Sequence, residues 1–243
     1  LVYFSSIGAY SPADGREIGE DWPTDGVPTA AYGREKAAVE RVLDAVEAGH
    51  PALRVVRFRP GFMFQSRSGP QQRRLFAGPL LPTSLLRPGR LPLVPFPAGL
   101  RLQVLATEDA ARACRLALHE EVRGAFNLAA EPLVDGPGLA AVLGGRPLPV
   151  PPSLVRLGLA AAWRAHLVPA EPALFDLAMR LPVMRTERAR HELGWVPRTT
   201  ATEALATAVA SMGDEAGGAT GPLAPDRMSD RLRQLLGGIG RRP

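Results

Sequence analysis

The chain has 243 residues, of which 46% are hydrophobic and 22% are charged, close to the averages for soluble globular proteins. This composition excludes disordered, collagen-like and coiled-coil proteins, and the length suits one globular domain or one with a small annex. The formal charge is +5, but 28 of the 29 basic residues are Arg, scattered along the chain, and only Lys36 is Lys. Scattered charge with few aromatic residues argues against a nucleic-acid partner.

The sequence also argues against disulfide, metal and membrane proteins. Its single cysteine, Cys114, allows no disulfide within the chain, and its four His residues are too widely spaced for a zinc site. The longest apolar run, 154–168, is interrupted by Arg156, Arg164 and His166 and is too polar to span a bilayer. We therefore expect a cytoplasmic protein without a metal, a membrane or a nucleic acid as partner.

The first sixty residues predict a parallel α/β unit. Residues 1–4 form an apolar run typical of a strand that is buried on both faces. Apolar positions that recur every 3.6 residues predict a helix over about 31–46, which ends before Pro51. Residues 53–58 predict a second buried strand. A strand, a helix and a strand in this order form a right-handed crossover, so the sheet should be parallel.

The remainder alternates an irregular segment with further elements. Seven prolines interrupt residues 63–100, and we interpret this irregular stretch as part of a substrate-binding lobe. The elements expected beyond it are a strand at 100–105, a helix from an N-cap at Thr107 to about His119, a strand at 125–129, helices at 139–143, 154–166 and 173–180, and a last helix from the box 200–203 to about Met212.

Tyr32 and Lys36 stand four residues apart on the first predicted helix. Their side chains therefore share one face and can bind the same ligand. A cation beside a phenol favours the phenolate form, which can exchange a proton with a substrate oxygen. The pair alone is not diagnostic, because a packed Tyr ring beside a solvated Lys has the same spacing.

Further motifs accompany this pair in order along the chain. They are Leu1-Val2-Tyr3-Phe4-Ser5-Ser6 followed by Tyr10, Tyr32-Gly33-Arg34-Glu35-Lys36, Arg57-Phe58-Arg59-Pro60-Gly61, Thr107-Glu108-Asp109-Ala110-Ala111, Gly124-Ala125-Phe126-Asn127-Leu128 and Leu193-Gly194-Trp195-Val196-Pro197. Over about residues 1–212 this order resembles the extended short-chain dehydrogenase/reductase superfamily, NAD-dependent epimerase/dehydratase type.

The resemblance implies a fold and a division of the chain. The fold would be an incomplete Rossmann-type, doubly wound parallel sheet with a smaller, mostly helical substrate-binding lobe. Residues 1–62 would be the C-terminal part of the dinucleotide-binding domain. Residues 63–212 would be mainly the lobe, with the strands near 100–105 and 125–129 returning to the sheet, and 213–243 would be a linker and a basic tail.

The resemblance also implies roles for individual residues. Tyr32 would be the general acid/base, Lys36 would hold the nicotinamide ribose, and Ser6 would donate a hydrogen bond to the reacting oxygen, although Ser5-Ser6 also suits a plain strand end. The residues that would approach the nicotinamide through their backbone are Pro60, Gly61, Phe62 and Met63. Those that would contact substrate are Arg59, which at a strand end is more often solvated, and Arg101, which lies slightly out of register with the family's diphosphate-binding Arg. Gly194 would cap a helix, and Trp195 would pack in the core.

The implied activity is that of an NAD(P)-dependent oxidoreductase or epimerase. It would act on a hydroxyl or carbonyl carbon of a sugar nucleotide or another small substrate, with NAD or NADP as cofactor, and a homodimer is compatible with the resemblance. Dehydration is disfavoured, because the family's dehydratases carry Asp-Glu where Ile7-Gly8 follows Ser6. The alternative is a non-catalytic dinucleotide-binding sensor or scaffold, which retention of Tyr32 and Lys36 argues against.

One family feature does not occur in the sequence. Members begin with a Gly-rich strand–turn–helix that takes the cofactor pyrophosphate, and no such motif is found here. The chain starts at Leu1, inside a predicted strand, without Met. We therefore expect a fragment that lacks roughly a hundred upstream residues, or three to four strand–helix steps of about 30 residues each, and that is inactive alone.

Overall fold

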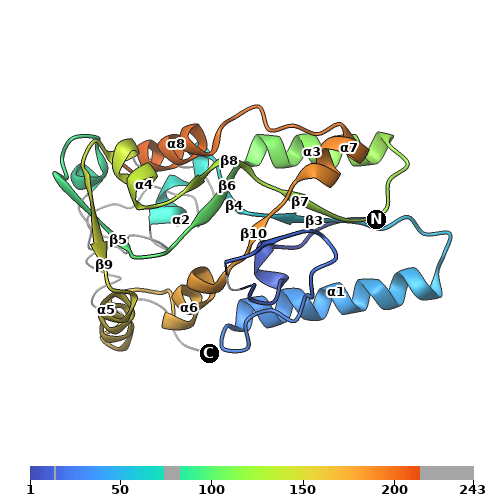
Figure 1. Cartoon of the computed structure of the whole chain (residues 1–243), viewed down its shortest axis with the longest axis horizontal. Helices are drawn as coiled ribbons and strands as arrows, with labels where there is room; N and C mark the ends of the chain where they lie inside the picture. The colour runs from blue at the N-terminus through green and yellow to red at the C-terminus, as the bar shows by residue number, and fades with distance from the viewer. Residues whose placement is uncertain (14, 74–82, 214–243) are drawn as a thin grey trace. The chain divides into compact units, whose positions relative to one another are not determined.

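The computed structural model describes residues 1–13, 15–73 and 83–213 (Figure 1). These residues divide into two compact units, each assembled from three stretches of chain. The first unit comprises the described residues of Leu1–Met63, Arg101–Val134 and Asp176–Ala201, and the second comprises the described residues of Phe64–Leu100, Asp135–Phe175 and 202–213.

A three-stranded parallel sheet forms the centre of the first unit. Its strands are β1 (Val2–Phe4), β3 (Val56–Pro60) and β7 (Gly124–Leu128), in the order β1-β3-β7. All five residues of β3 are buried, as expected for the central strand of a parallel sheet. The ring of Phe58 on β3 lies 5.2 Å from that of Phe4 and 6.3 Å from that of Phe126. The predicted parallel pairing of the first two strands is thus confirmed.

Helix α1 (Ala31–Gly49) connects β1 to β3, as the periodicity predicts. A one-turn helix, η1 (Ile7–Ala9), follows β1 and packs against α1. A Cβ on Gly33 of α1 would lie only 2.9 Å from the carbonyl oxygen of Gly8 in η1. Glycine at position 33 therefore lets the two backbones touch, with no side chain between them.

A second sheet in the order β4-β6-β8 follows the turn after β3. It consists of β4 (Phe62–Phe64), β6 (Leu102–Ala106) and β8 (Ala130–Val134), with β6 and β8 antiparallel. The predicted strand near 100–105 therefore forms, but it pairs with β4 and β8 rather than with β3. The chain turns at Gly61, where a Cβ would overlap the carbonyl oxygen of Gln103 on β6. A further parallel pair joins β2 (Glu17–Ile18) to β10 (Val183–Met184).

Two of the sequence motifs interlock through Asp109. Helix α3 (Thr107–His119) begins one residue earlier than expected, because Ala106 and not Thr107 is its N-cap. The Asp109 carboxylate accepts hydrogen bonds from the backbone N–H groups of Arg198 and Thr199 at 2.9 and 3.0 Å. The indole N–H of Trp195 donates to the Asp109 carbonyl at 2.9 Å. As predicted, Trp195 is fully buried, and Gly194 ends α7 (Glu187–Leu193) in the left-handed conformation.

The second unit contains a parallel pair of strands that the sequence concealed. Strand β5 (Leu93–Pro97) pairs with β9 (Arg146–Val150), so the prediction that 63–100 is irregular throughout is wrong. Each strand carries Pro at alternate positions, which leaves the intervening N–H groups free for pairing. The other elements are η2 (Ser66–Ser68), α2 (Gly69–Gln72), η4 (Thr83–Leu86), α4 (Gly136–Leu143), α5 (Pro152–Arg164), α6 (Pro172–Arg180, which continues into the first unit) and α8 (Ala201–Gly213).

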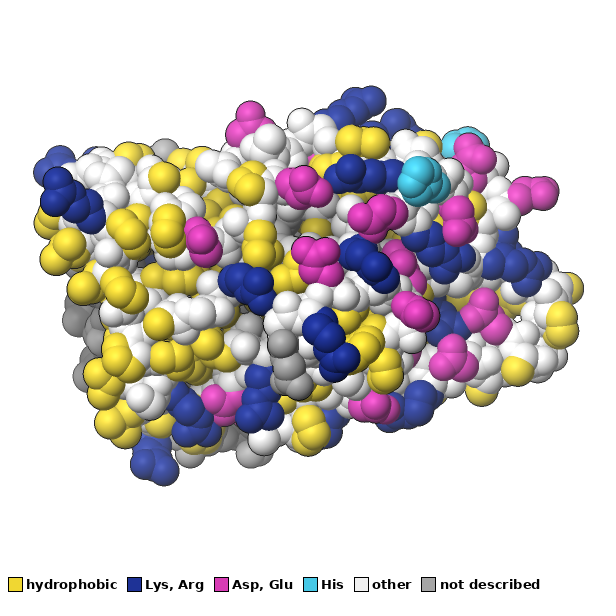
Figure 2. Space-filling view, viewed as in Figure 1, with side chains coloured by type: hydrophobic (Ala, Val, Ile, Leu, Met, Phe, Trp, Pro, Cys, Tyr) yellow, Lys and Arg dark blue, Asp and Glu magenta, His cyan; other side chains and the backbone are white. Residues whose placement is uncertain are grey.

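The surface of the molecule carries charged side chains of both signs. Acidic and basic side chains are interspersed over the face shown in Figure 2. Within the described ranges, every helix is too short or too polar to cross a membrane. The predicted tail lies outside the described residues from 214 on.

Candidate functional site

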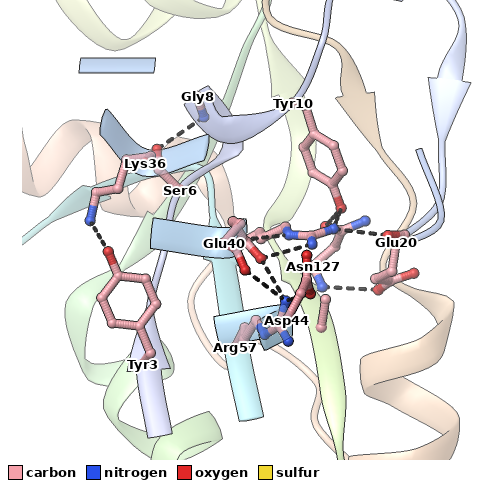
Figure 3. Close-up of polar contacts among 12 residues, drawn as sticks. Tyr3, Ser6, Gly8, Tyr10, Glu20, Lys36, Glu40, Asp44, Arg57 and Asn127 are labelled. Carbon is pink, nitrogen blue, oxygen red and sulfur yellow. Dashed lines mark hydrogen bonds and ion pairs between the residues drawn. The ribbon is translucent and has the colours of Figure 1, made fainter. Parts of the chain in front are cut away.

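Ser6, Tyr32 and Lys36 lie on neighbouring elements of the first unit. Ser6 caps η1 directly after β1, and its buried hydroxyl oxygen accepts a hydrogen bond from the Gly8 N–H at 3.0 Å (Figure 3). Tyr32 and Lys36 stand in the first two turns of α1. The Tyr32 side chain is 42% exposed, whereas Lys36 is half-buried.

Gly8 marks the point where the Ser6 and Tyr32 side chains meet. A Cβ on Gly8 would lie 3.2 Å from Cε1 of the Tyr32 ring and 3.3 Å from Oγ of Ser6. The ring and the hydroxyl therefore flank the same small volume, and a larger residue at position 8 would push them apart. The structure thus brings together the two residues that the sequence assigns to the reacting oxygen.

The Lys36 ammonium reaches the carboxyl end of β1. Its Nζ donates to the Phe4 carbonyl at 3.1 Å. Nζ also donates to the Tyr3 hydroxyl at 3.4 Å, as Figure 3 shows. It also lies 5.2 Å from the centroid of the Tyr3 ring and 5.9 Å from that of Tyr32. The Lys36 charge therefore acts on both rings.

Residues 60–63 lie at the same edge of the sheet as Ser6. The carboxyl ends of parallel strands meet at one edge, and Pro60 ends β3 beside the end of β1. The Gly61 N–H donates to the Leu128 carbonyl at 2.9 Å, which fixes the turn. Phe62 is half-buried, and Met63 is 40% exposed. The segment is therefore placed at the edge where open α/β sheets bind their ligands.

Arg59 points into the fold, and the prediction that it faces a ligand is wrong. Only 5% of its surface is exposed. Its guanidinium donates to both carboxylate oxygens of Glu40, at 2.9 and 3.0 Å, to the Tyr10 hydroxyl at 2.9 Å and to the Glu20 carbonyl at 2.8 Å. This corrects the expected substrate contact, because the guanidinium is engaged inside the fold and serves to hold it together.

Glu40 is the buried carboxylate that sequence reasoning missed. Burial raises the pKa of its carboxyl, but hydrogen bonds and charge from Arg59, with smaller contributions from Ser5 and Arg57, outweigh burial and lower the pKa. Arg57 in turn contacts Glu40 at 3.3 Å and also pairs with carboxylates further along α1. The sequence did contain a pattern that indicates its position, because Glu40 follows Lys36 by four residues and so lies on the same face of the helix.

Tyr10 connects this buried pair to β7. Its hydroxyl accepts from Arg59 and donates to Oδ1 of Asn127 at 2.7 Å. Burial raises the pKa of the Tyr10 phenol to about 12, against the lowering effect of the Arg59 charge. Tyr10 is therefore a buried structural hydroxyl, unlike the exposed Tyr32.

Two other features of the first unit lie apart from the residues assigned to the reacting oxygen. Arg101 is exposed, and its guanidinium lies beside Gly15. A surface hollow of about 490 Å³ is lined by Gly19, Glu20, Asp21, Arg185, Glu187 and Arg188. Arg188 there is paired with Glu192.

The parallel sheet, the crossover helix and the turn after β3 together give the chain a Rossmann-type α/β fold. No protein-family model matches the chain, and no curated protein sequence matches it. Solved structures do match it in fold. The UDP-glucose 4-epimerase of Thermus thermophilus, in complex with NAD, aligns with a TM-score of 0.55 at 21% identity over 87% of this chain and 63% of that one.

Two further structures extend the comparison. The UDP-glucose 4-epimerase of Thermotoga maritima, with UDP-glucose, gives a TM-score of 0.58 at 18% identity over 88% of this chain and 63% of that chain. That of Stenotrophomonas maltophila, with NAD and formylated UDP-arabinopyranose, gives 0.60 at 18% identity, with coverage of 87% and 62%. The chain spans less than two thirds of the length of these structures. The likeness shows that the chain shares its α/β, Rossmann-like fold with these structures over the aligned region.

Proposed function

We propose that the chain belongs to an NAD(P)-dependent epimerase or oxidoreductase that acts on a hydroxyl or carbonyl carbon of a sugar nucleotide or another small molecule. The observation that carries this proposal is the meeting of the Ser6 hydroxyl and the Tyr32 ring around Gly8, with the Lys36 ammonium within 5.9 Å of that ring. We further propose that the substrate-binding lobe lies mainly in residues 63–212 and that the chain alone is inactive.

The described residues fit the nicotinamide half of a dinucleotide. An ammonium has three N–H donors, and Lys36 directs two of them to Phe4 and Tyr3, which leaves one for a ribose hydroxyl. The backbone of residues 60–63 would border the nicotinamide at the carboxyl edge of the sheet. When bound, NAD or NADP would accept hydride from the substrate carbon and return it.

Ser6 would donate a hydrogen bond to a substrate oxygen. Its Oγ already accepts the Gly8 N–H, so the hydroxyl proton remains available for a ligand. The Tyr32 phenol would give a proton to that oxygen or take one from it, and the positive charge of Lys36 would stabilise the phenolate form. This division of roles supports proton transfer at a carbinol or carbonyl oxygen.

Binding of NAD tests the proposed inactivity of the chain. The 243-residue chain should bind NAD weakly or not at all, because its sequence supplies the nicotinamide side but no Gly-rich motif for the pyrophosphate. Isothermal titration calorimetry measures this directly. A micromolar dissociation constant for the isolated chain would contradict the proposal.

Turnover of UDP-sugars tests the activity itself. A protein that joins this chain to a Gly-rich strand–turn–helix for the pyrophosphate should interconvert or oxidise a UDP-sugar with NAD. Product chromatography and NADH absorbance measure this turnover. Binding of NAD without turnover of any hydroxyl or carbonyl substrate would instead favour the sensor or scaffold role.

A further inference from the structure

The ammonium of Lys36, the chain's only lysine, donates hydrogen bonds to residues of strand β1. Lys36 sits on α1, but both of its hydrogen bonds go to consecutive residues of β1, Tyr3 and Phe4. One acceptor is a backbone carbonyl, which any residue at position 4 would supply. The other is a side-chain hydroxyl, which depends on the residue at position 3.

Tyr3 contacts this ammonium more closely than Tyr32 does. The Tyr3 ring centroid lies 5.2 Å from Nζ and the Tyr32 centroid 5.9 Å, and the hydroxyl of Tyr3 is an acceptor for it. Tyr3 is half-buried on a strand that pairs with β3, whereas Tyr32 is 42% exposed on a helix. The better-anchored of the two rings is therefore that of Tyr3, which had no role assigned from the sequence.

We propose that Tyr3 is a positioning residue that holds the Lys36 ammonium at the carboxyl end of β1 before any cofactor binds. The proposal rests on the proposed function, because it gives a role to the cation that serves Tyr32 and the ribose. A lysine side chain has several rotatable bonds, and fixing it costs entropy at the moment of binding. A ring and a carbonyl that fix it beforehand reduce this cost, which is the general benefit of preorganisation.

The ring of Tyr3 should matter more than its hydroxyl. The N···O distance of 3.4 Å is long for a hydrogen bond, whereas 5.2 Å from ammonium to centroid is within the range of a cation–π contact. Tyr3→Phe keeps the ring and should loosen Lys36 slightly. Tyr3→Ile removes the ring, keeps good strand propensity and should loosen Lys36 clearly.

The rate at which Lys36 is acetylated reports its freedom directly. Because the chain has one lysine, a single side-chain acetylation with an N-hydroxysuccinimide ester can be followed by mass spectrometry, with peptide mapping to separate the N-terminal amine. Tyr3→Ile should speed acetylation by about two- to fivefold, and Tyr3→Phe by less. The measurement uses the cofactor-free chain, so its outcome does not depend on whether the chain binds NAD.

Two matched variants separate positioning from general loosening. Phe4→Leu removes a ring from the same strand but keeps the carbonyl that Lys36 uses, so it should leave the rate unchanged. Tyr32→Leu should speed acetylation less than Tyr3→Ile does. An unchanged rate in Tyr3→Ile, or an equal rise in Phe4→Leu, would overturn the proposal. If Tyr3→Ile does not fold, Tyr3→Leu decides, because it also removes the ring, and a rate equal to the native one would overturn the proposal.

Discussion

The two units differ in how they use charge and apolar surface. In the first unit, Glu40 is 1% exposed and lies against Arg57 and Arg59, each 5% exposed. In the second unit, α5 has no fully buried residue, and its Leu154 and Leu157 are 58% and 66% exposed. A buried ion pair depends on each of its partners, whereas an exposed leucine contributes little. Substitutions should therefore be costly in the buried ion pair of the first unit and tolerated on α5.

The loss of turnover in Tyr32→Phe should be the strongest of these effects, and it tests whether Tyr32 of the first unit transfers the proton. Tyr32→Phe removes only the phenol hydroxyl and keeps the ring against Gly8, so the fold should survive. In a form of the protein that binds NAD and is active, turnover should fall by about 10²–10⁴-fold, the usual contribution of general acid/base catalysis. Steady-state kinetics on any active substrate measures it. Native-like turnover in Tyr32→Phe would contradict the catalytic assignment of Tyr32 and favour the non-catalytic sensor role.

The next effect tests the buried ion pair. Glu40→Gln removes the negative charge that holds Arg59 and Arg57, and the two guanidinium groups would remain buried without it. The free energy of unfolding should fall by about 3–5 kcal/mol.

Urea unfolding measures this loss, and a nearby residue of α1 supplies its control. Glu35 is exposed on the same helix, so Glu35→Gln should change stability by less than about 0.5 kcal/mol. Similar losses in both variants would show that the contrast between buried and exposed charge does not hold.

A smaller effect concerns alkaline pH. The pKa of Tyr10 is raised from 10.0 to about 12 in the folded chain. As the pH rises through this interval, the unfolded chain loses a proton that the folded chain keeps, so stability falls by about 2–3 kcal/mol between pH 10 and 12. Thermal unfolding of native chain and Tyr10→Phe across that interval measures it. The variant should be less stable at neutral pH and should show a shallower decline.

The smallest expected effect comes from the second unit. Leu157→Ser on α5 replaces an exposed side chain and should alter the free energy of unfolding by less than about 0.5 kcal/mol. Thermal unfolding beside the native chain measures it. A loss comparable to that of Glu40→Gln would mean that α5 is covered in solution, and the comparison between the units would fail.

The sequence predicted the first unit better than the second. Strand β1 is a continuous apolar run, β3 ends at the predicted Pro60-Gly61 turn, and α1 follows the helical period, so local pattern and tertiary structure agree there. Strands β5 and β9 were missed because their prolines mask the strand signal, and only pairing shows that the remaining N–H groups suffice. The role of Arg59 was predicted wrongly, because its partner Glu40 lies 19 residues away in the sequence and meets it only in the fold.

The candidate site shows the same division. Ser6, Tyr32 and Lys36 were identified from motif spacing, and the structure brings them together, although their catalytic roles remain predictions. Tyr3 escaped notice because an aromatic residue in a buried strand needs no special explanation. Its contact with Lys36 depends on how α1 crosses β1, and the sequence of either element does not contain that information.

The contact between Gly8 and Gly33 has a consequence for how the protein can change over evolutionary time. The separation of η1 and α1 is set by two backbones that touch, so it does not depend on how nearby side chains repack. Core substitutions can therefore accumulate, raising or lowering the melting temperature, while the gap between the Ser6 hydroxyl and the Tyr32 ring keeps its width. Core substitutions should therefore change the stability of this chain without changing its reaction rate, whereas a substitution of Gly8 or Gly33 should change both.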